Sequence, residues 1–334
     1  MSTPERIRIT NREDLVAAVP YLVGFHPDNS IVCLALHDRM LNCILRFDLP
    51  EPTAAEELQA AAARLAGYGS AAVLVGYGPA DRVEPAVAAL ATGLRATPVD
   101  VLDMLRVDGN RYFSLCDDPN CATDRAPHEV TASAVPAEAT YAGVAPLPSR
   151  AALEQLIAPI AGPGRDRMDT VTCDALRRLH DVLRDDPDSG VDDETVSVGA
   201  AVVHCGVTAV QHAHEAAGRG AVLSDEEVAW LTAVLILPEV RGFALSACDG
   251  SEAQRQLWID VTRRAMPDTT AAPACLLAVT AYLAGDGALA NIAVDRALQA
   301  DPQFGLAHLL GDVLQSGIPP HLWQVMIRSA ADNT

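Results

Sequence analysis

The chain contains no lysine, and all 24 of its basic residues are arginine, against 44 acidic residues. Without lysine there is no phosphate-loop lysine for nucleotides, no kinase strand lysine and no Schiff base with pyridoxal phosphate. The net charge of −20 also disfavours nucleic-acid binding, which needs a basic surface to displace counterions from phosphates. We therefore predict no nucleic-acid partner and no cofactor.

Signals for export or membrane insertion are also lacking. The N-terminus has no apolar core, and the longest uncharged run, from Thr195 to His214, carries three histidines and a glutamine, which favours a buried helix over a membrane span. The eight cysteines are scattered rather than densely spaced as in secreted disulfide scaffolds. These features predict a cytoplasmic protein with no membrane partner.

A chain of 334 residues is too long for one ordinary core, so we expect two domains. Residues 1–130 alternate strand and helix signals, which predicts an α/β domain with a mixed sheet in three layers. Strands are predicted at 7–9, 31–36, 41–48, 71–77, 99–107 and 111–115, and helices from Asn11 to Gly24 and at 53–66 and 81–94. Asn11 with Asp14 resembles a capping box that opens the first helix, and Gly24 is suited to the left-handed cap that ends it.

The second half has a different pattern. Residues 131–149 are rich in proline and alanine without periodicity, which predicts a linker. Residues 150–334 are typical of an all-α domain, and Ser224 with Glu227 forms a capping box at the start of its longest helical run.

The segment 272–316 has the spacing of a tetratricopeptide helical hairpin, although alanines occupy its large aromatic positions. The matching small and large positions are Leu277, Ala278, Gly285, Ala290, Val294, Ala297 and Pro302. Asn291, Asp295 and Gln299 recur every four residues and form one polar stripe, which we predict to contact a protein partner.

Three loops of the first half are candidates for a small-molecule site, because ligands of open α/β sheets bind at strand ends. The loops are 24–30, 76–78 and 111–121, and the candidate ligand-binding residues are Gly24, His26, Asp28, Ser30, Gly76, Gly78 and Arg111. His26 is the natural acid or base of such a site and Arg111 its natural anion partner. The alternative, which we favour, is that His26 has a purely structural role in a type I turn over His26–Asn29, with Pro27 at the second position.

The remaining motifs favour structure over chemistry. Gly76-x-Gly78 lacks the third glycine of a dinucleotide loop, and Asp81 in its place would repel a pyrophosphate and is typical of a helix N-cap. Cys116, Cys121 and His128 offer three ligands where structural zinc needs four, so a metal there is the weaker alternative to a turn with two thiols. His212 and His214 would point about 200° apart on one helix and could not share a metal.

Over nearly its full length the chain resembles an actinobacterial family described as domain of unknown function 4192. The resemblance rests on "AAVPYLVGFHPDNSIVCLAL", "RYFSLCDDPNC" and "LPEVRGFAL", and on the helical stretch that begins "PACLLAVTAYLAGDG". Tyr112 and Phe113 stand where the family usually has tryptophans, Ala122 where it has a second cysteine, and Gly242 where it has an acid. The resemblance implies the architecture above and no particular activity.

Two functions remain open from the sequence. The first, which we favour, is a non-enzymatic protein-interaction or regulatory module that uses the C-terminal helices. The alternative is a small-molecule-binding or catalytic site formed by the three loops of the α/β half.

Overall fold

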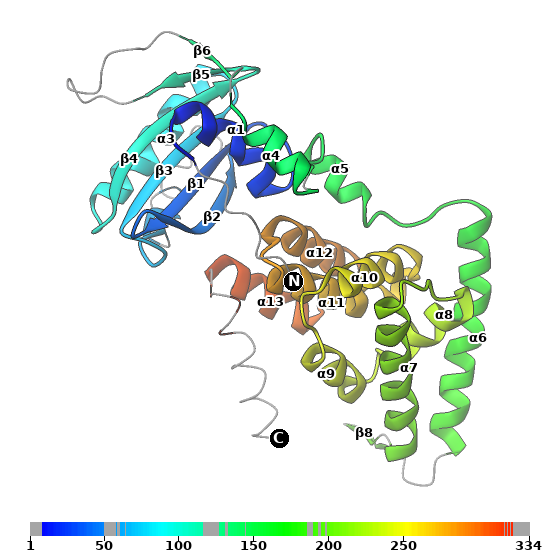
Figure 1. The fold of residues 1–334 in the computed structure, drawn as a ribbon. Helices are drawn as coiled ribbons and strands as arrows, with labels where there is room; N and C mark the ends of the chain where they lie inside the picture. Colours follow the sequence, from blue (N-terminus) through cyan, green and yellow to red (C-terminus); the bar gives the residue numbers. More distant parts are fainter. Residues whose placement is uncertain are drawn as a thin grey trace. The chain divides into compact units, whose positions relative to one another are not determined.

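The computed structural model describes residues 9–49, 58, 61–63, 65–115, 127–130, 133–143, 145–185, 190–192, 195–197, 199–316, 318, 320 and 322. Contacts along the chain divide it into two compact units, Met1–Ala152 (unit 1) and Leu153–Thr334 (unit 2). Unit 1 holds a six-stranded sheet with helices, and the described part of unit 2 is almost entirely helical (Figure 1). The mixed α/β class predicted from the sequence is confirmed.

The sheet of unit 1 runs in the order β2-β1-β3-β4-β5-β6, and among its described strands only β3 and β4 pair in parallel. The strands are β1 (Ser30–His37), β2 (Met40–Asp48), β3 (Ala71–Tyr77), β4 (Asp100–Asp108), β5 (Arg111–Ser114) and β6 (His128–Glu129). The predicted hairpins of 31–36 with 41–48 and of 99–107 with 111–115 are both confirmed. The predicted strand at 7–9 lies largely outside the described residues.

The β1–β2 hairpin has a two-residue turn with left-handed backbone. Asp38 and Arg39 have φ of 50° and 63°, and His37 pairs with Met40 on either side of them. Turns of this hand match the twist of the strands they join, and aspartate tolerates the left-handed region better than most residues. The turn sets the pairing next to it, and a one-residue register shift between Ala35 and Leu36 then places Ser30 opposite Asp48.

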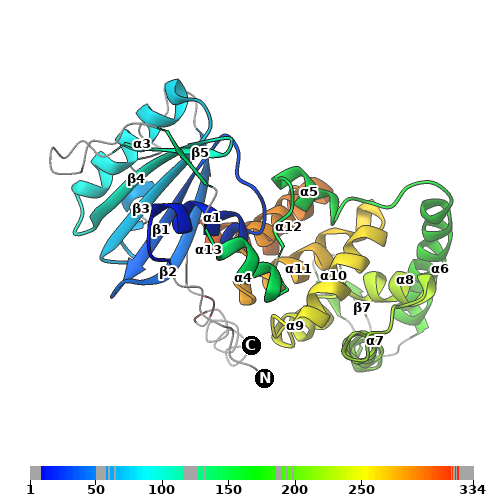
Figure 2. The ribbon, with the colours of Figure 1, turned by 45° about the horizontal axis from the view of Figure 1, so that its top comes forward.

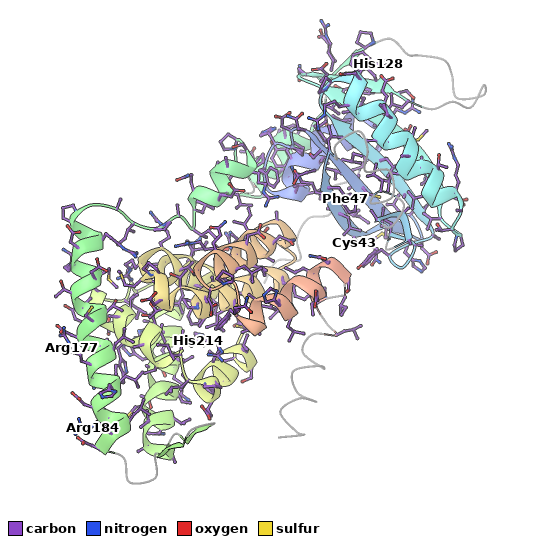
Figure 3. All side chains as sticks on the ribbon, turned by 180° about the vertical axis from the view of Figure 1, so that it is seen from behind. Cys43, Phe47, His128, Arg177, Arg184 and His214 are labelled. Atoms are coloured by element: carbon purple, nitrogen blue, oxygen red, sulfur yellow. The ribbon has the colours of Figure 1, made fainter. Side chains whose placement is uncertain are left out.

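Helices lie on both faces of this sheet. On one face, α3 (Ala80–Arg95) joins β3 to β4 and buries Val83, Val87 and Leu90 against the strands. Figure 3 shows α3 over this face, with Phe47 and Cys43 labelled on β2. On the other face lies α1 (Arg12–Val23), in front of the sheet in Figure 1, and α4 (Val135–Tyr141) packs on α1. Apolar side chains therefore point both ways from the central strands.

The ends of α1 follow the sequence signals closely. The Asn11 side chain caps the helix by accepting a hydrogen bond from the Asp14 amide, and the helix continues through Pro20. Gly24 ends it with a left-handed φ of 88°, as predicted for this glycine. At α3 the prediction differs, because the N-cap is Pro79 and Asp81 lies in the first turn of the helix.

The segment predicted as a linker, 131–149, contains a packed helix. Val135 of α4 is buried against Ala17 and Ala18 of α1, and Leu147 pairs with the backbone of Phe25. The small side chains that suggested a linker allow α4 to pack closely on α1 instead. The segment belongs to unit 1, whose last residue is Ala152.

Unit 2 is built around α11, whose side chains are buried along almost the whole helix. Its helices are α6 (Pro163–Asp185), α7 (Ala200–Gly218), α8 (Asp225–Val234), α9 (Pro238–Ser246), α10 (Glu252–Arg264), α11 (Ala271–Leu283), α12 (Gly287–Ala300) and α13 (Gly305–Ser316), preceded by α5 (Arg150–Gln155) at the boundary of the units. A short ribbon of β7 (Gly190–Asp192) and β8 (Thr195–Ser197) lies between α6 and α7. Figure 2, in which α7 is seen end on, shows α8 beside α6 and α7.

The uncharged run that starts at Thr195 is not one buried helix as predicted. Residues 195–197 form β8, α7 begins at Ala200, and one face of α7 is exposed while Val202, Val210 and Ala213 are buried. Among the described residues, no single helix is both long and apolar enough to cross a membrane. The helices α8 and α9 meet that test only as a pair, bent by 108°.

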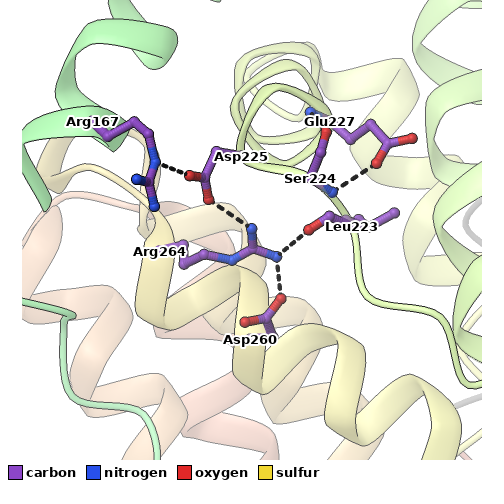
Figure 4. A network of polar contacts seen from close by, with 7 residues as sticks. All are labelled: Arg167, Leu223, Ser224, Asp225, Glu227, Asp260 and Arg264. Atoms are coloured by element: carbon purple, nitrogen blue, oxygen red, sulfur yellow. Dashed lines mark hydrogen bonds and ion pairs between the residues drawn. The ribbon is translucent and has the colours of Figure 1, made fainter. Parts of the chain in front are cut away.

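A polar network joins three helices of unit 2 (Figure 4). The Asp225 carboxylate accepts hydrogen bonds from Arg167 of α6 at 2.5 Å and from Arg264 of α10 at 3.1 Å. Arg264 is 9 % exposed and also donates to the Asp260 carboxylate and, at 3.0 Å, to the Leu223 carbonyl. The predicted capping box of Ser224 and Glu227 is confirmed at the start of α8, beside this network.

Candidate functional site

The structure brings parts of the three predicted loops of unit 1 to one end of the sheet. Ser30 begins β1 and pairs with Tyr77 at the end of β3, while β4 ends at Asp108 opposite Arg111, the first residue of β5. Residues 24–30, 76–78 and 111 therefore lie at the same end. Cys116 and Cys121 in the third loop lie outside the described residues.

One row of cross-strand partners crosses the whole sheet at this end. In the order of the strands it consists of Asp48, Ser30, Tyr77, Val107, Tyr112 and His128, which we call the end row. Side chains of directly paired residues lie on the same face of a sheet. Ile31, the neighbour of Ser30, packs in the core under α3, so the end row is on the opposite face, which α1 covers.

Ser30 and Tyr77 carry the most unusual groups of the end row. Ser30 is fully buried, Tyr77 is 6 % exposed, and neither Ser30 Oγ nor Tyr77 Oη has a hydrogen-bond partner in the described part of the chain. Burial raises the pKa of Tyr77 far above its ordinary value, so the phenol stays protonated. Both hydroxyls can therefore donate and accept a hydrogen bond.

A guanidinium lies on the same face at the β2 end of the row. Arg46 Nη2 donates to Asp48 at 2.7 Å, and the guanidinium lies 5.5 Å from the centroid of the buried Phe25 ring. Arg46 Nε is buried and has no hydrogen-bond partner among the described residues. Three buried polar atoms without partners thus belong to this face, at the end where β1 begins.

At the far end of the row, Tyr112 and His128 stack with ring centroids 5.0 Å apart. His128 therefore has an aromatic neighbour, and Figure 3 labels it on the short strand β6. No group of three or more metal-ligating side chains occurs in the part of the chain that the structure describes. The predicted metal set of Cys116, Cys121 and His128 falls partly outside that part.

The opposite face of the same sheet end is a structural ion-pair cluster. Arg106 is 7 % exposed and has Asp108 at 3.1 Å and Glu84 at 3.5 Å, with its guanidinium 3.9 Å from the centroid of the Phe113 ring. Arg111, the predicted anion partner, pairs with Glu129 at 3.8 Å. Because Arg111 is the partner of Asp108 in the register, it lies on the Arg106 face and not on the face of the end row.

His26 and Asp28 lie in the irregular segment that leads into β1. No hydrogen-bonded turn forms at His26–Asn29, and the chain bends at Asn29, which has a left-handed φ of 43°. The His26 amide donates to the Leu147 carbonyl, and its exposed ring makes no hydrogen bond or ion pair with a described residue. The predicted type I turn is therefore replaced by backbone pairing with residue 147, and Asp28 accepts hydrogen bonds from Asn29.

Gly76 and Gly78 in the predicted loops have structural roles, in close packing and in backbone conformation. A Cβ on Gly76 would lie 2.2 Å from Val83 Cγ1, so this glycine lets α3 approach β3 closely. Gly78 has a φ of 131°, which favours glycine, and its amide donates to the Val107 carbonyl. Both observations favour the β-turn-α junction over a dinucleotide loop.

In unit 2 the predicted partner-binding residues share one face. Asn291, Asp295 and Gln299 are all exposed on α12, while Ile292, Ala293 and Val294 between them are buried. The neighbouring α11 is buried along its length, so of these two helices only α12 has an exposed face.

His212 and His214 lie on opposite sides of α7, as predicted, near Glu227 and Trp258 respectively.

Sequence reasoning missed Tyr77, Arg46 and Asp48. Alternation along each strand shows only that Ser30 shares a face with Val32 and that Tyr77 shares a face with Val75; the register between β1 and β3 places Ser30 and Tyr77 together.

A search of curated proteins and a search of solved structures find no match to this chain. The family model described as Domain of unknown function (DUF4192) matches residues 13–321, nearly the whole chain. The chain belongs to this DUF4192 family.

Proposed function

We propose that unit 1 binds a small polar molecule at the end row, without catalysing its conversion. The observation that carries this proposal is that Ser30 and Tyr77, which pair directly across β1 and β3, both carry buried hydroxyls without a hydrogen-bond partner among the described residues. Buried polar groups are almost always hydrogen-bonded, and the exceptions belong to bound water, ions or functional sites. A ligand group between the two hydroxyls would remove both exceptions at once.

The chemistry of the three unpartnered atoms defines the ligand. Arg46 Nε can only donate, and the two hydroxyls can donate or accept. A group with at least two acceptor oxygens, such as a carboxylate, an amide with a neighbouring hydroxyl, or a sugar, suits this set. Because Arg46 already pairs with Asp48, the site carries little net charge, and a neutral oxygen-rich molecule fits it better than a polyanion.

Native mass spectrometry of the protein purified from cells, without chelators or extensive dialysis, tests this proposal. We expect a fraction of the wild-type protein to carry the extra mass of one small molecule, and the double variant Ser30→Ala and Tyr77→Phe to lose it. The matched control is Ser246→Ala in unit 2, whose exposed hydroxyl donates to the Phe243 carbonyl within one helical turn. Extra mass retained by the double variant, or a bare polypeptide mass in every sample, contradicts the proposal.

A second candidate function is a non-enzymatic, protein-binding role of unit 2, supported by the exposed stripe of Asn291, Asp295 and Gln299. In this proposal α11 and α12 act as a tetratricopeptide-like hairpin that binds through the outer face of α12, because α11 has no exposed face. The test is to compare partners cross-linked by the wild-type protein and by the triple alanine variant. Identical partners for both proteins contradict a role of this stripe.

A further inference from the structure

Unit 2 contains a concavity between three helices, which we call the α7 groove. It has a volume of about 500 Å³ and is lined on α6 by Arg178, on α7 by His204, Thr208 and His212, and on α8 by Trp230 and Leu231. Volumes of 300–1,000 Å³ are usual for small-molecule sites. A neighbouring hollow of about 620 Å³ continues along α6 and shares Arg178 with the groove.

The groove follows from how three helices pack. Both α6 and α7 pack on α8, while α6 and α7 make few direct contacts, so α8 forms the floor between two walls. On the other side of α7, Gly206 allows α9 to pack closely, because a Cβ at this position would lie 2.4 Å from a methyl group of Val240. The wall of α7 that faces the groove includes the exposed residues His204, Thr208 and His212, at intervals of four, with Cys205 and Ala209 between them.

Arg178 is the principal charged group of the groove. Its guanidinium lies 4.4 Å from the centroid of the Trp230 ring, and no carboxylate of a described residue lies within 4.0 Å of it. The preceding arginine, Arg177, pairs with Asp174 at 2.5 Å. The guanidinium of Arg178 is thus stacked on an indole, and its N–H groups make no ion pair with a described carboxylate. Such a group is suited to bind an anion, even in a chain with a net charge of −20.

The one carboxylate in the groove is already engaged. Glu227 accepts a hydrogen bond from the Ser224 amide at 2.7 Å as part of the capping box, and His212 Nε2 lies 2.9 Å from its other oxygen. These two partners lower the pKa of Glu227, the capping amide most, and both of its carboxylate oxygens are already hydrogen-bonded. Beyond the polar rim, Leu231 and Leu223 are buried and present an apolar floor.

We infer that the α7 groove binds a small organic anion with an apolar body. Its carboxylate or sulfonate contacts Arg178, and its apolar part lies against Trp230 and Leu231. The groove is confined to unit 2, so this inference is independent of the end row in unit 1.

The probe is 8-anilinonaphthalene-1-sulfonate, which combines an aromatic body with a fixed negative charge. We expect one probe to bind the folded full chain, with bound-probe fluorescence giving the affinity. Arg178→Gln should weaken binding by at least about tenfold, because it removes a charge-assisted hydrogen bond to the sulfonate. Arg177→Gln is the matched control, because it removes the same charge one residue away, and it should change the affinity less than twofold.

Competition separates anion recognition from simple apolar binding. We expect 4-phenylbutyrate to displace the probe and the neutral 4-phenylbutanol to displace it at least about tenfold less well, for the same reason. Equal displacement by the two compounds overturns the inference. Equal effects of Arg177→Gln and Arg178→Gln, or no saturable binding of the probe, overturn it as well. Far-UV circular dichroism of both variants verifies that the helices are intact.

Discussion

Ser30 and Tyr77 lie directly opposite each other on β1 and β3, and neither buried hydroxyl has a hydrogen-bond partner among the described residues. An unsatisfied buried polar group costs about 1–3 kcal/mol. Two such groups in one cross-strand pair are a large cost for a domain whose whole stability is of the order of 10 kcal/mol. A bound polar molecule that pairs with both would recover this free energy, which is why we place the ligand here.

Tyr77→Phe removes one of these hydroxyls without changing the shape of the core. In protein freed of small molecules by denaturation and refolding, we expect the free energy of unfolding to stay equal or to rise by about 1 kcal/mol, because an unsatisfied group is lost. In protein purified directly from cells, the same variant should unfold at a lower temperature than the wild type, because it lacks the stabilising ligand. A loss of 1 kcal/mol or more in the refolded protein would show that the hydroxyl is already satisfied.

Gly76→Ala tests whether this glycine serves packing. The new Cβ would lie 2.2 Å from Val83 Cγ1, so α3 must shift, and we expect a loss of about 1–3 kcal/mol in the free energy of unfolding. Gly242→Ala in α9 is the matched control, because nothing lies within 4 Å of its Cβ position, and it should stabilise by about 0.5–1 kcal/mol through helix propensity. Urea denaturation measures both, and equal effects of the two substitutions would contradict the packing role.

Asp225→Ala tests the network of Figure 4. The buried Arg264 would keep Asp260 and the Leu223 carbonyl but lose a charged partner, so we expect a loss of about 2 kcal/mol, less than for a buried pair that is fully broken. The control is Asp174→Ala, which removes the exposed pair with Arg177 and should cost less than about 1 kcal/mol.

The same network gives a dependence on pH. The hydrogen bond from Arg167, together with that from Arg264, lowers the pKa of Asp225. A carboxyl whose pKa is lowered by folding stabilises the protein above its unfolded pKa of about 3.9, and this contribution is lost as the pH falls through the lower, folded pKa. Below that range, wild type and Asp225→Ala should differ less in free energy of unfolding than at pH 7, and an unchanged difference would argue against the ion pairs.

His214→Phe should reduce the loss of stability between pH 7 and pH 5. His214, labelled in Figure 3, is packed edge-on against Trp258, and burial lowers its pKa despite the opposing influence of Asp249. Below the unfolded pKa of about 6.5 the unfolded chain binds a proton that the folded chain does not, so wild-type stability falls as the pH drops. Phenylalanine keeps the ring contact and does not titrate. Equal slopes of unfolding free energy against pH for the two proteins would contradict this account.

The sequence was a good guide where one local signal decided the structure. The apolar run of β1, the cap at Asn11 and the left-handed Gly24 are short-range features, and each forms as predicted. The segment 131–149 was not predictable in this way, because whether an alanine-rich stretch packs depends on the groove that α1 offers it. The prediction of a type I turn at His26–Asn29 was wrong for a similar reason, since the pairing of this segment with residue 147 is a long-range contact.

Only part of the candidate site could be predicted from the sequence. The three loops could be assigned to one end of the sheet from strand order, and Ser30 was among the predicted residues. Arg111, predicted as the anion partner of this site, lies on the other face from the end row, because its side depends on the register with Asp108, which no local pattern gives. Tyr77 was missed because a tyrosine at the end of an apolar strand is usually core, and only its unpartnered hydroxyl distinguishes it.

The most direct test of the central claim is a crystal structure of the protein, purified from cells without dialysis, at a resolution that shows ordered small molecules. We expect electron density for one organic molecule with oxygen atoms within hydrogen-bond distance of both Ser30 Oγ and Tyr77 Oη. Density for water alone between the two hydroxyls, or a direct hydrogen bond that joins them, would contradict it.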